Sequence, residues 1–237
     1  MHKIFCLPYA GGSSTMYFKL RKNLEAQYKV IPVEYSGHGY RMDEKLISDV
    51  SACIDDVYDF INENCSNDDF SILGYSLGGA IAYEVAKKIT NESGYTKRLK
   101  SLIICSCAAP NCPETIHEFD SLSDQDFMKY LIRLGGTTIN SRDDERALRF
   151  FLPIVKSDFN LYSKYKSLAL ETVPMKIDIP ISVFYSCDEK KKIDLWDHFS
   201  SYPVNYKYFN GGHFFINEQC DNLASSVLEV LNKVHLV

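Results

Sequence analysis

The segment 70–80, FSILGYSLGGA, constrains this chain more than any other part of it. A short apolar run passes through Gly74-x-Ser76-x-Gly78 and continues into residues with helical spacing. A serine on so tight a strand-to-helix turn needs neighbours that lack side chains, and the turn exposes its hydroxyl. It also directs the positive end of the helix at any oxyanion that forms beside the serine. The pattern predicts a nucleophile elbow for acyl transfer, with Ser76 as the nucleophile.

Strand-like and helical patterns alternate along most of the chain. The strand-like runs are residues 3–7, 29–35, 70–74, 99–107, 180–187 and 204–209. Between and after them, residues 46–61 and 223–234 each form one apolar helical stripe. This alternation predicts an α/β fold with a mostly parallel central sheet and helices on both faces. The length of 237 residues fits a single domain, 1–237.

Residues 109–173 have no strand pattern, although they follow a strand. Ser123 is expected to begin one helix and Ser141 a second, which Pro153 would break or kink. An insertion this long inside a domain is typical of a functional element. We therefore expect a helical lid at 109–173 whose helices form a wall of the acyl pocket over Ser76.

Composition excludes several classes of function. The net charge of −5 is unlike that of nucleic-acid-binding proteins, and no apolar run is long enough to cross a membrane. The first strand-like run starts at Lys3, so no secretion signal is expected. The eight cysteines lie mostly in apolar patterns without metal-ligand spacing, so reduced thiols in a cytoplasmic protein are expected.

Serine needs a general base and a group that orients the base. His213 lies in Gly211-Gly-His-Phe-Phe215, directly after the last predicted strand. Asp188 follows the strand that ends at Cys187 and should face the same carboxyl edge of the sheet, whereas Glu189 and Asp194 lie beyond it. The chain order Ser76, Asp188, His213 is the order expected for an elbow enzyme.

The other histidines are weaker candidates for the base. His38 lies in a glycine-rich loop, Tyr35-Ser-Gly-His-Gly39, and could approach the substrate or be an ordinary loop residue. The remaining four are expected to be solvated side chains: His2, His117, His198 and His235.

Two backbone N–H groups should bind the oxyanion. One belongs to Leu77, directly after the nucleophile, and the other to the loop after the first strand. In that loop, Gly11 and Gly12 permit a tight turn, and Ala10 is the expected donor. A plain glycine turn with no such role is the alternative.

Together these segments resemble the stand-alone type II thioesterases of nonribosomal peptide and polyketide synthases, within the α/β-hydrolase superfamily. The resemblance spans nearly the whole chain. It rests on the elbow and on residues 5–12, 35–39, 122–127, 134–136, 152–159 and 211–215. It implies Ser76, His213 and Asp188 as the catalytic residues, Ala10 and Leu77 as the oxyanion donors, and a lid at 109–173.

The resemblance also implies a reaction and partners. The family hydrolyses acyl groups from the phosphopantetheine arms of carrier protein domains through an acyl-serine intermediate and needs no cofactor of its own. Small acyl thioesters and a monomeric enzyme are expected. The family usually has arginine where this chain has His38 and often histidine at Tyr75, so these two positions are expected to lie near the substrate and to alter its choice.

Three other functions remain possible interpretations of the sequence. A medium-chain thioesterase that releases finished products and a carboxylesterase would use the same three residues, because thioesters and oxygen esters share a tetrahedral intermediate. A non-catalytic binding protein with a hydrolase fold is the third, and the intact candidate residues count against it.

Overall fold

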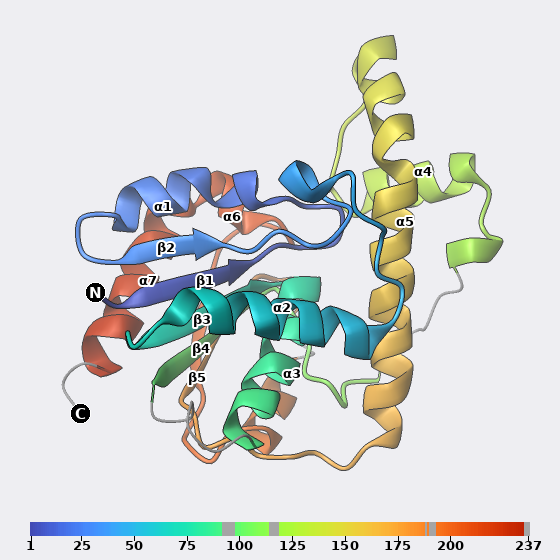
Figure 1. The fold of residues 1–237 in the computed structure, drawn as a ribbon. Helices are drawn as coiled ribbons and strands as arrows, with labels where there is room; N and C mark the ends of the chain where they lie inside the picture. Colours follow the sequence, from blue (N-terminus) through green and yellow to red (C-terminus); the bar gives the residue numbers. More distant parts are fainter. Residues whose placement is uncertain (92–97, 114–118, 188, 190–192, 235–237) are drawn as a thin grey trace.

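A parallel sheet of six strands forms the centre of the molecule (Figure 1). The computed structural model describes residues 1–91, 98–113, 119–187, 189 and 193–234. The strands are β1 (Lys3–Leu7), β2 (Lys29–Pro32), β3 (Phe70–Tyr75), β4 (Leu99–Cys105), β5 (Ile181–Tyr185) and β6 (Asn205–Tyr208). Their order is β2-β1-β3-β4-β5-β6, and every neighbouring pair is parallel. All six predicted runs form strands.

Helices cover both faces of the sheet, as predicted. On one face lie α2 (Val50–Cys65) and α3 (Leu77–Asn91), and on the other lie α1 (Phe18–Leu24) and α7 (Cys220–Val234). All five residues of β1 are buried: Phe5 packs into the first core and Ile4 into the second. A strand covered on both sides is mostly apolar on both faces, which explains why these runs do not alternate.

Some predicted ends were wrong by a few residues. The strands expected to reach residues 35, 107 and 187 end at Pro32, Cys105 and Tyr185, because the chain turns there into the loops of the carboxyl edge. The helical stripe expected from residue 46 begins at Val50. The carboxylate of Asp49 accepts a hydrogen bond from the Ala52 N–H at 2.9 Å and caps this helix.

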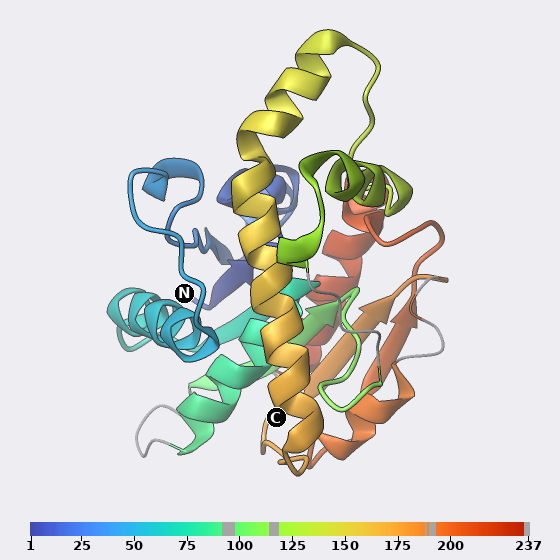
Figure 2. The ribbon, with the colours of Figure 1, turned by 90° about the vertical axis from the view of Figure 1, so that its right-hand side faces the viewer.

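The 109–173 segment contains two main helices, α4 (Asp124–Arg133) and α5 (Arg142–Glu171). The predicted starts are confirmed, since the Ser123 and Ser141 hydroxyls accept hydrogen bonds from the N–H groups of the first turns. Pro153 does not break α5, which is 30 residues long and includes the proline. Figure 2 shows instead that the first turns of α5 lean away from the rest, as a proline inside a helix causes.

The 109–173 segment has a small apolar core of its own. It consists of Phe119, Phe127, Met128, Leu131 and Leu152. The Phe119 ring lies across the Phe159 ring at 5.1 Å between centroids, so α5 is joined to the residues before α4 by aromatic contacts. The C-terminal half of α5 belongs to the main core through Leu161 and Tyr165. The helix α5 therefore joins the sheet domain to this separate cluster.

Shorter helical turns complete the described chain. They are η1 (Ser14–Tyr17), η2 (Gly39–Arg41), η3 (Phe119–Ser121), η4 (Asp194–His198) and α6 (Phe215–Glu218). No helix within the described ranges has the length and apolarity needed to cross a membrane.

Cysteine burial agrees with the sequence expectation in seven cases. None of the eight cysteines, all of which the structure describes, forms a disulfide; Cys187 is exposed and the others are buried. Burial raises the pKa of the Cys53 thiol to about 12, so this group stays protonated at neutral pH and is a poor nucleophile.

Candidate active site

Ser76 occupies a strained turn between β3 and α3. Its φ of 53° lies in the left-handed region, which a residue with a side chain seldom adopts. Two hydrogen bonds hold the turn: Ser76 N–H donates to the Cys105 carbonyl, and Gly79 N–H donates to the Ser76 carbonyl, both at 2.8 Å. The strain persists because the surrounding sheet fixes this backbone, as is common at functional sites.

The two glycines of the elbow are required by close backbone approach. A Cβ at Gly74 would collide with the carbonyl of Gly78, and a Cβ at Gly78 would collide with the carbonyl of Leu7. The helix α3 can therefore begin directly against the ends of β1 and β3 only because both positions lack side chains. The structure thus confirms the prediction that the turn at Ser76 needs neighbours without side chains.

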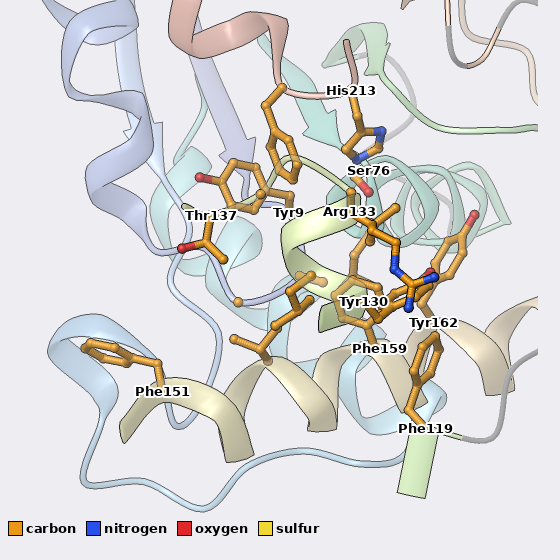
Figure 3. Close-up of a pocket in the computed structure, with 18 of the residues that line it drawn as sticks. Tyr9, Ser76, Phe119, Tyr130, Arg133, Thr137, Phe151, Phe159, Tyr162 and His213 are labelled. Carbon is orange, nitrogen blue, oxygen red and sulfur yellow. The ribbon is translucent and has the colours of Figure 1, made fainter. Parts of the chain in front are cut away.

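Ser76 and His213 face the same pocket. In Figure 3 the Ser76 hydroxyl and the His213 imidazole point toward one another. His213 lies in the loop between β6 and α6, and its side chain is half-buried. The Nδ1 atom of His213 lies 2.9 Å from Oε1 of Glu189.

Glu189 is buried and held on both of its oxygens. Its Oε2 atom accepts hydrogen bonds from the N–H of Ser186 at 2.8 Å and from the Ser186 hydroxyl at 2.6 Å. Burial disfavours the charged carboxylate, but the hydrogen bonds from His213 and Ser186 outweigh it and lower the pKa of Glu189. An ionised carboxylate only accepts, so Nδ1 of His213 carries a proton and, in the neutral ring, Nε2 keeps the lone pair that a general base needs.

The predicted acid, Asp188, lies outside the residues that the structure describes. Among the described residues, the carboxylate of Glu189, the next residue, contacts His213; the sequence placed Glu189 in the loop beyond the strand. The sequence does contain a pattern that indicates a role for Glu189. Ser186-x-x-Glu189 has the spacing of a capping box, in which the acid returns to the N–H of the serine, as the 2.8 Å bond does here.

Two hydroxyl groups donate hydrogen bonds to the backbone carbonyl of His213. Tyr75 donates to the His213 carbonyl at 2.6 Å, and Ser106 donates to the same oxygen at 2.8 Å. Tyr75 is fully buried and does not belong to the described pocket wall, so it contacts the base rather than the pocket. The sequence reasoning missed Ser106, whose φ of 47° places it in a strained turn after β4.

Ala10 and Leu77 both line the pocket beside Ser76. Leu77 is the first residue of α3, where backbone N–H groups have no partner within the helix. The other loop amides are occupied: Gly11 N–H donates to Oδ2 of Asp158 at 2.7 Å, and Gly12 N–H donates to the Tyr9 carbonyl at 2.8 Å.

His38 is buried away from the described pocket wall. Its Nε2 atom lies 2.9 Å from Oδ2 of Asp158 on α5, and its Nδ1 atom lies 3.1 Å from the Ser36 carbonyl. Burial alone would lower the pKa of His38, but the hydrogen bond and charge of Asp158, with smaller contributions from Ser36 and Glu34, raise it.

The remaining histidines lie apart from the pocket. The prediction that His2 is solvated is wrong, because its ring is buried and lies 3.0 Å from the Ser71 hydroxyl. His198 is exposed, as predicted. His117 and His235 lie outside the described residues.

The pocket has a volume of about 900 Å³ and lies between the carboxyl edge of the sheet and the helices of the 109–173 segment. Aromatic side chains of that segment form much of its wall, as Figure 3 shows for Phe119, Tyr130, Phe151, Phe159 and Tyr162. The expectation that these helices wall a pocket over Ser76 is confirmed. Within the described part of the chain, no group of three or more His, Cys, Asp or Glu side chains could hold a metal ion.

Comparison with known proteins agrees with this site. The model of the thioesterase domain family matches residues 2–233. The chain belongs to the thioesterase family. The family assignment confirms the resemblance found from the sequence, and the parallel sheet with its covering helices confirms the α/β-hydrolase fold.

Relatives of this thioesterase include proteins that are named for biosynthetic pathways. Thioesterase PikA5 of Streptomyces venezuelae is 25% identical over 97% of this chain and 80% of its own length. A Vibrio anguillarum protein named "Probable anguibactin biosynthesis thioesterase AngT" is 28% identical over 92% of this chain and 86% of its own. The crystal structure of ClbQ from the colibactin NRPS/PKS pathway superposes with a TM-score of 0.85, covering 99% of this chain and 98% of ClbQ at 25% identity.

Proposed function

We propose that this thioesterase hydrolyses acyl groups from the phosphopantetheine arms of carrier protein domains, as an editing enzyme of a peptide or polyketide synthase. The observation that carries the proposal is the site itself: an elbow serine and a histidine–carboxylate pair meet in a pocket closed by a helical segment. The relatives named for biosynthetic pathways support the substrate class.

In the proposed triad Ser76 is the nucleophile, His213 the general base and Glu189 the orienting acid. The carboxylate of Glu189 fixes the proton on Nδ1 of His213 and stabilises the imidazolium that forms when Nε2 takes the proton of Ser76. The hydrogen bonds from Ser186 support this role, because they keep Glu189 ionised and in one position.

Acylation begins when Oγ of Ser76 attacks the thioester carbonyl carbon while Nε2 of His213 accepts its proton. The carbon–sulfur bond of the tetrahedral intermediate then breaks, and the imidazolium returns the proton to the leaving thiolate. Water enters, His213 removes its proton, and the hydroxide attacks the acyl-Ser76 carbonyl. Collapse releases the carboxylic acid and restores the serine hydroxyl, so all atoms balance without a cofactor of the enzyme.

The oxyanion is bound in this mechanism by the N–H groups of Leu77 and Ala10. Gly11 and Gly12 donate elsewhere, to Asp158 and to Tyr9, which supports Ala10 as the donor of that loop. The amide of Leu77 supports the second position, because it lies at the first residue of α3, where the helix dipole also favours negative charge.

The 109–173 segment is proposed to act as a lid over the bound acyl group. Its aromatic side chains support an apolar acyl chain, and the polar arm of a carrier domain would enter from the mouth of the pocket. The buried reduced thiols support a cytoplasmic enzyme. The proposal includes no cofactor and a monomeric enzyme.

The test is mass spectrometry of the enzyme, intact and after digestion, following brief exposure to carrier domains loaded with different acyl groups. We expect an adduct with the mass of the acyl group on the peptide that contains Ser76, and none in Ser76→Ala. Hydrolysis that proceeds unchanged in Ser76→Ala would show that the catalytic assignment is wrong.

Relative rates distinguish the alternatives. Acyl groups on carrier domains should be released faster than the same groups on coenzyme A or on aryl esters. Preference for the aryl esters would identify a carboxylesterase, and preference for medium chains on a single carrier would identify a product-releasing enzyme. Binding without turnover of any of these would identify a non-catalytic protein.

A further inference from the structure

A second histidine–carboxylate pair lies beneath α5, outside the proposed triad. The side chains of His38 and Asp158 are 3% and 5% exposed and approach to 2.9 Å. The same oxygen of Asp158, Oδ2, also accepts the Gly11 N–H at 2.7 Å. One carboxylate of the lid helix therefore contacts both the His38 loop and the loop that carries the proposed oxyanion donor, Ala10.

The contacts of His38 define its protonation state. Its Nδ1 atom faces the Ser36 carbonyl at 3.1 Å, and a carbonyl oxygen only accepts, so Nδ1 carries a proton. Its Nε2 atom faces Oδ2 of Asp158, which already accepts from Gly11. A second ring proton satisfies this contact, so the pair is an imidazolium and a carboxylate, both buried and mutually neutralised.

Asp158 selects one conformation of the oxyanion loop. Gly12 N–H donates to the Tyr9 carbonyl, so residues 9–12 form a tight turn, and Gly11 at its third position has a φ of 74°. A positive φ there is the mark of a type II turn, whose central peptide is reversed relative to type I. Reversal back would point the Ala10 carbonyl at the Asp158 carboxylate instead of the Gly11 N–H.

Packing from α5 reinforces this choice. Val155, three residues before Asp158, lies against Gly11 so closely that a Cβ there would come within 2.7 Å of its side chain. The lid helix therefore touches the turn with an apolar group and a charged group from adjacent positions of one face.

We infer that Asp158 is a positioning residue for catalysis: held by protonated His38, it fixes the Ala10–Gly11 peptide and so the turn in which the preceding peptide, Tyr9–Ala10, presents the proposed oxyanion donor, the Ala10 N–H. The inference rests on the proposed function, since it requires that Ala10 bind the oxyanion. The inference connects α5 with transition-state stabilisation, because the oxyanion site is formed only when α5 packs against the loop of residues 9–12.

Loss of the proton from His38 should weaken this arrangement. The groups that face the pair are Glu34 and Tyr35, from the chain after β2, and Cys53, from α2. Glu34 favours the charged ring, while Tyr35 and Cys53 are neutral at ordinary pH because burial raises the pKa of each. At alkaline pH the ring of His38 would therefore no longer donate to Asp158. Of the two hydrogen bonds that Oδ2 of Asp158 accepts, the one from the Gly11 N–H would remain.

The test compares Asp158→Ala and Asp158→Asn with the control Asp143→Asn, an exposed carboxylate of the same helix. The substrate is an acyl thioester of N-acetylcysteamine, and the second probe is an alkyl boronic acid, whose oxygen occupies the oxyanion position after addition of Ser76. For Asp158→Ala we expect kcat to fall about 10- to 100-fold with little change in KM, and the boronic acid to bind more weakly by a similar factor. Asp158→Asn should lose less, because its amide oxygen still accepts the Gly11 N–H.

The pH dependence of kcat in His38→Arg is an independent test, because arginine keeps its charge at alkaline pH. The kcat of the wild type should fall at alkaline pH as His38 loses its proton, and His38→Arg should remove that fall. Unchanged kcat and boronic acid affinity in the Asp158 variants, or an alkaline limb that persists in His38→Arg, would overturn the inference. If Asp158→Ala does not fold, Asp158→Asn and His38→Arg decide the question. An inactive wild type would instead refute the proposed function itself.

Discussion

Two histidine–carboxylate pairs with the same 2.9 Å separation lie in the described part of this thioesterase and differ in what they can do. His213 is 25% exposed, faces the pocket and contacts Glu189 through Nδ1. His38 is 3% exposed and contacts an acceptor with each ring nitrogen. The first ring has a nitrogen directed at the substrate space, whereas the second has both nitrogens engaged.

The comparison shows that residue type and distance do not identify a general base. A base needs one nitrogen with a lone pair and access to the substrate, which His213 has in the proposed mechanism. His38 is instead a buried cation that compensates a buried carboxylate. The two histidines differ in the surroundings of Nε2, which contacts Asp158 in His38 and faces the pocket in His213.

The largest expected effect separates the two rings directly. His213→Ala should lower kcat for a small thioester by at least about 10⁴-fold, because the proton of Ser76 then has no acceptor. His38→Ala should lower it by about 10- to 100-fold, through the oxyanion loop alone. Steady-state kinetics measures both, and equal losses would show that the two pairs are not distinct in function.

The two neighbouring acids give the next largest effect. Glu189→Gln should lower kcat by about 10²- to 10⁴-fold, since an amide in place of the carboxylate no longer fixes the proton on Nδ1 of His213. Asp188→Asn is the matched control and should change kcat by less than about 3-fold. The reverse outcome would assign the acid to Asp188, as the sequence alone suggested.

The buried pair should make stability depend on pH. The raised pKa of His38 means that its contribution is complete below the unfolded value of about 6.5 and is lost as pH rises through the folded pKa. We expect His38→Gln to be less stable than wild type by about 3–5 kcal/mol at acidic pH, with the difference shrinking on the alkaline side. Urea unfolding across this range measures it, with exposed His198→Gln as the control; a difference independent of pH would contradict the protonated pair.

Tyr75 gives the smallest effect. Tyr75→Phe removes one of two hydroxyl groups on the His213 carbonyl and should lower stability by about 1 kcal/mol and kcat by about 2- to 5-fold. Exposed Tyr208→Phe serves as the control. A change of substrate preference with no loss of kcat would place Tyr75 near the substrate, as the family comparison at this position suggested.

Much of the fold could be predicted from the sequence because its signals are local. The apolar runs of the buried strands, the serine caps of α4 and α5 and the glycines around Ser76 each depend on a few adjacent residues. The position of His213 after the last strand followed from the topology of a parallel sheet. Pro153 was harder to interpret, because whether a proline ends or bends a helix depends on how the turns beyond it pack.

The sequence by itself determined a mostly parallel sheet with helices on both faces and the elbow at Ser76, because periodicity and backbone geometry impose them. The length and position of the 109–173 insertion predicted that it forms a wall of the pocket. Only the tertiary structure decided that Glu189 reaches His213 and that His38 meets Asp158, 120 residues away. Such contacts join side chains from loops and helices whose relative placement no local pattern specifies. The hydrogen bonds and charges that surround each buried group then set its charge, and these surroundings exist only once the chain is folded.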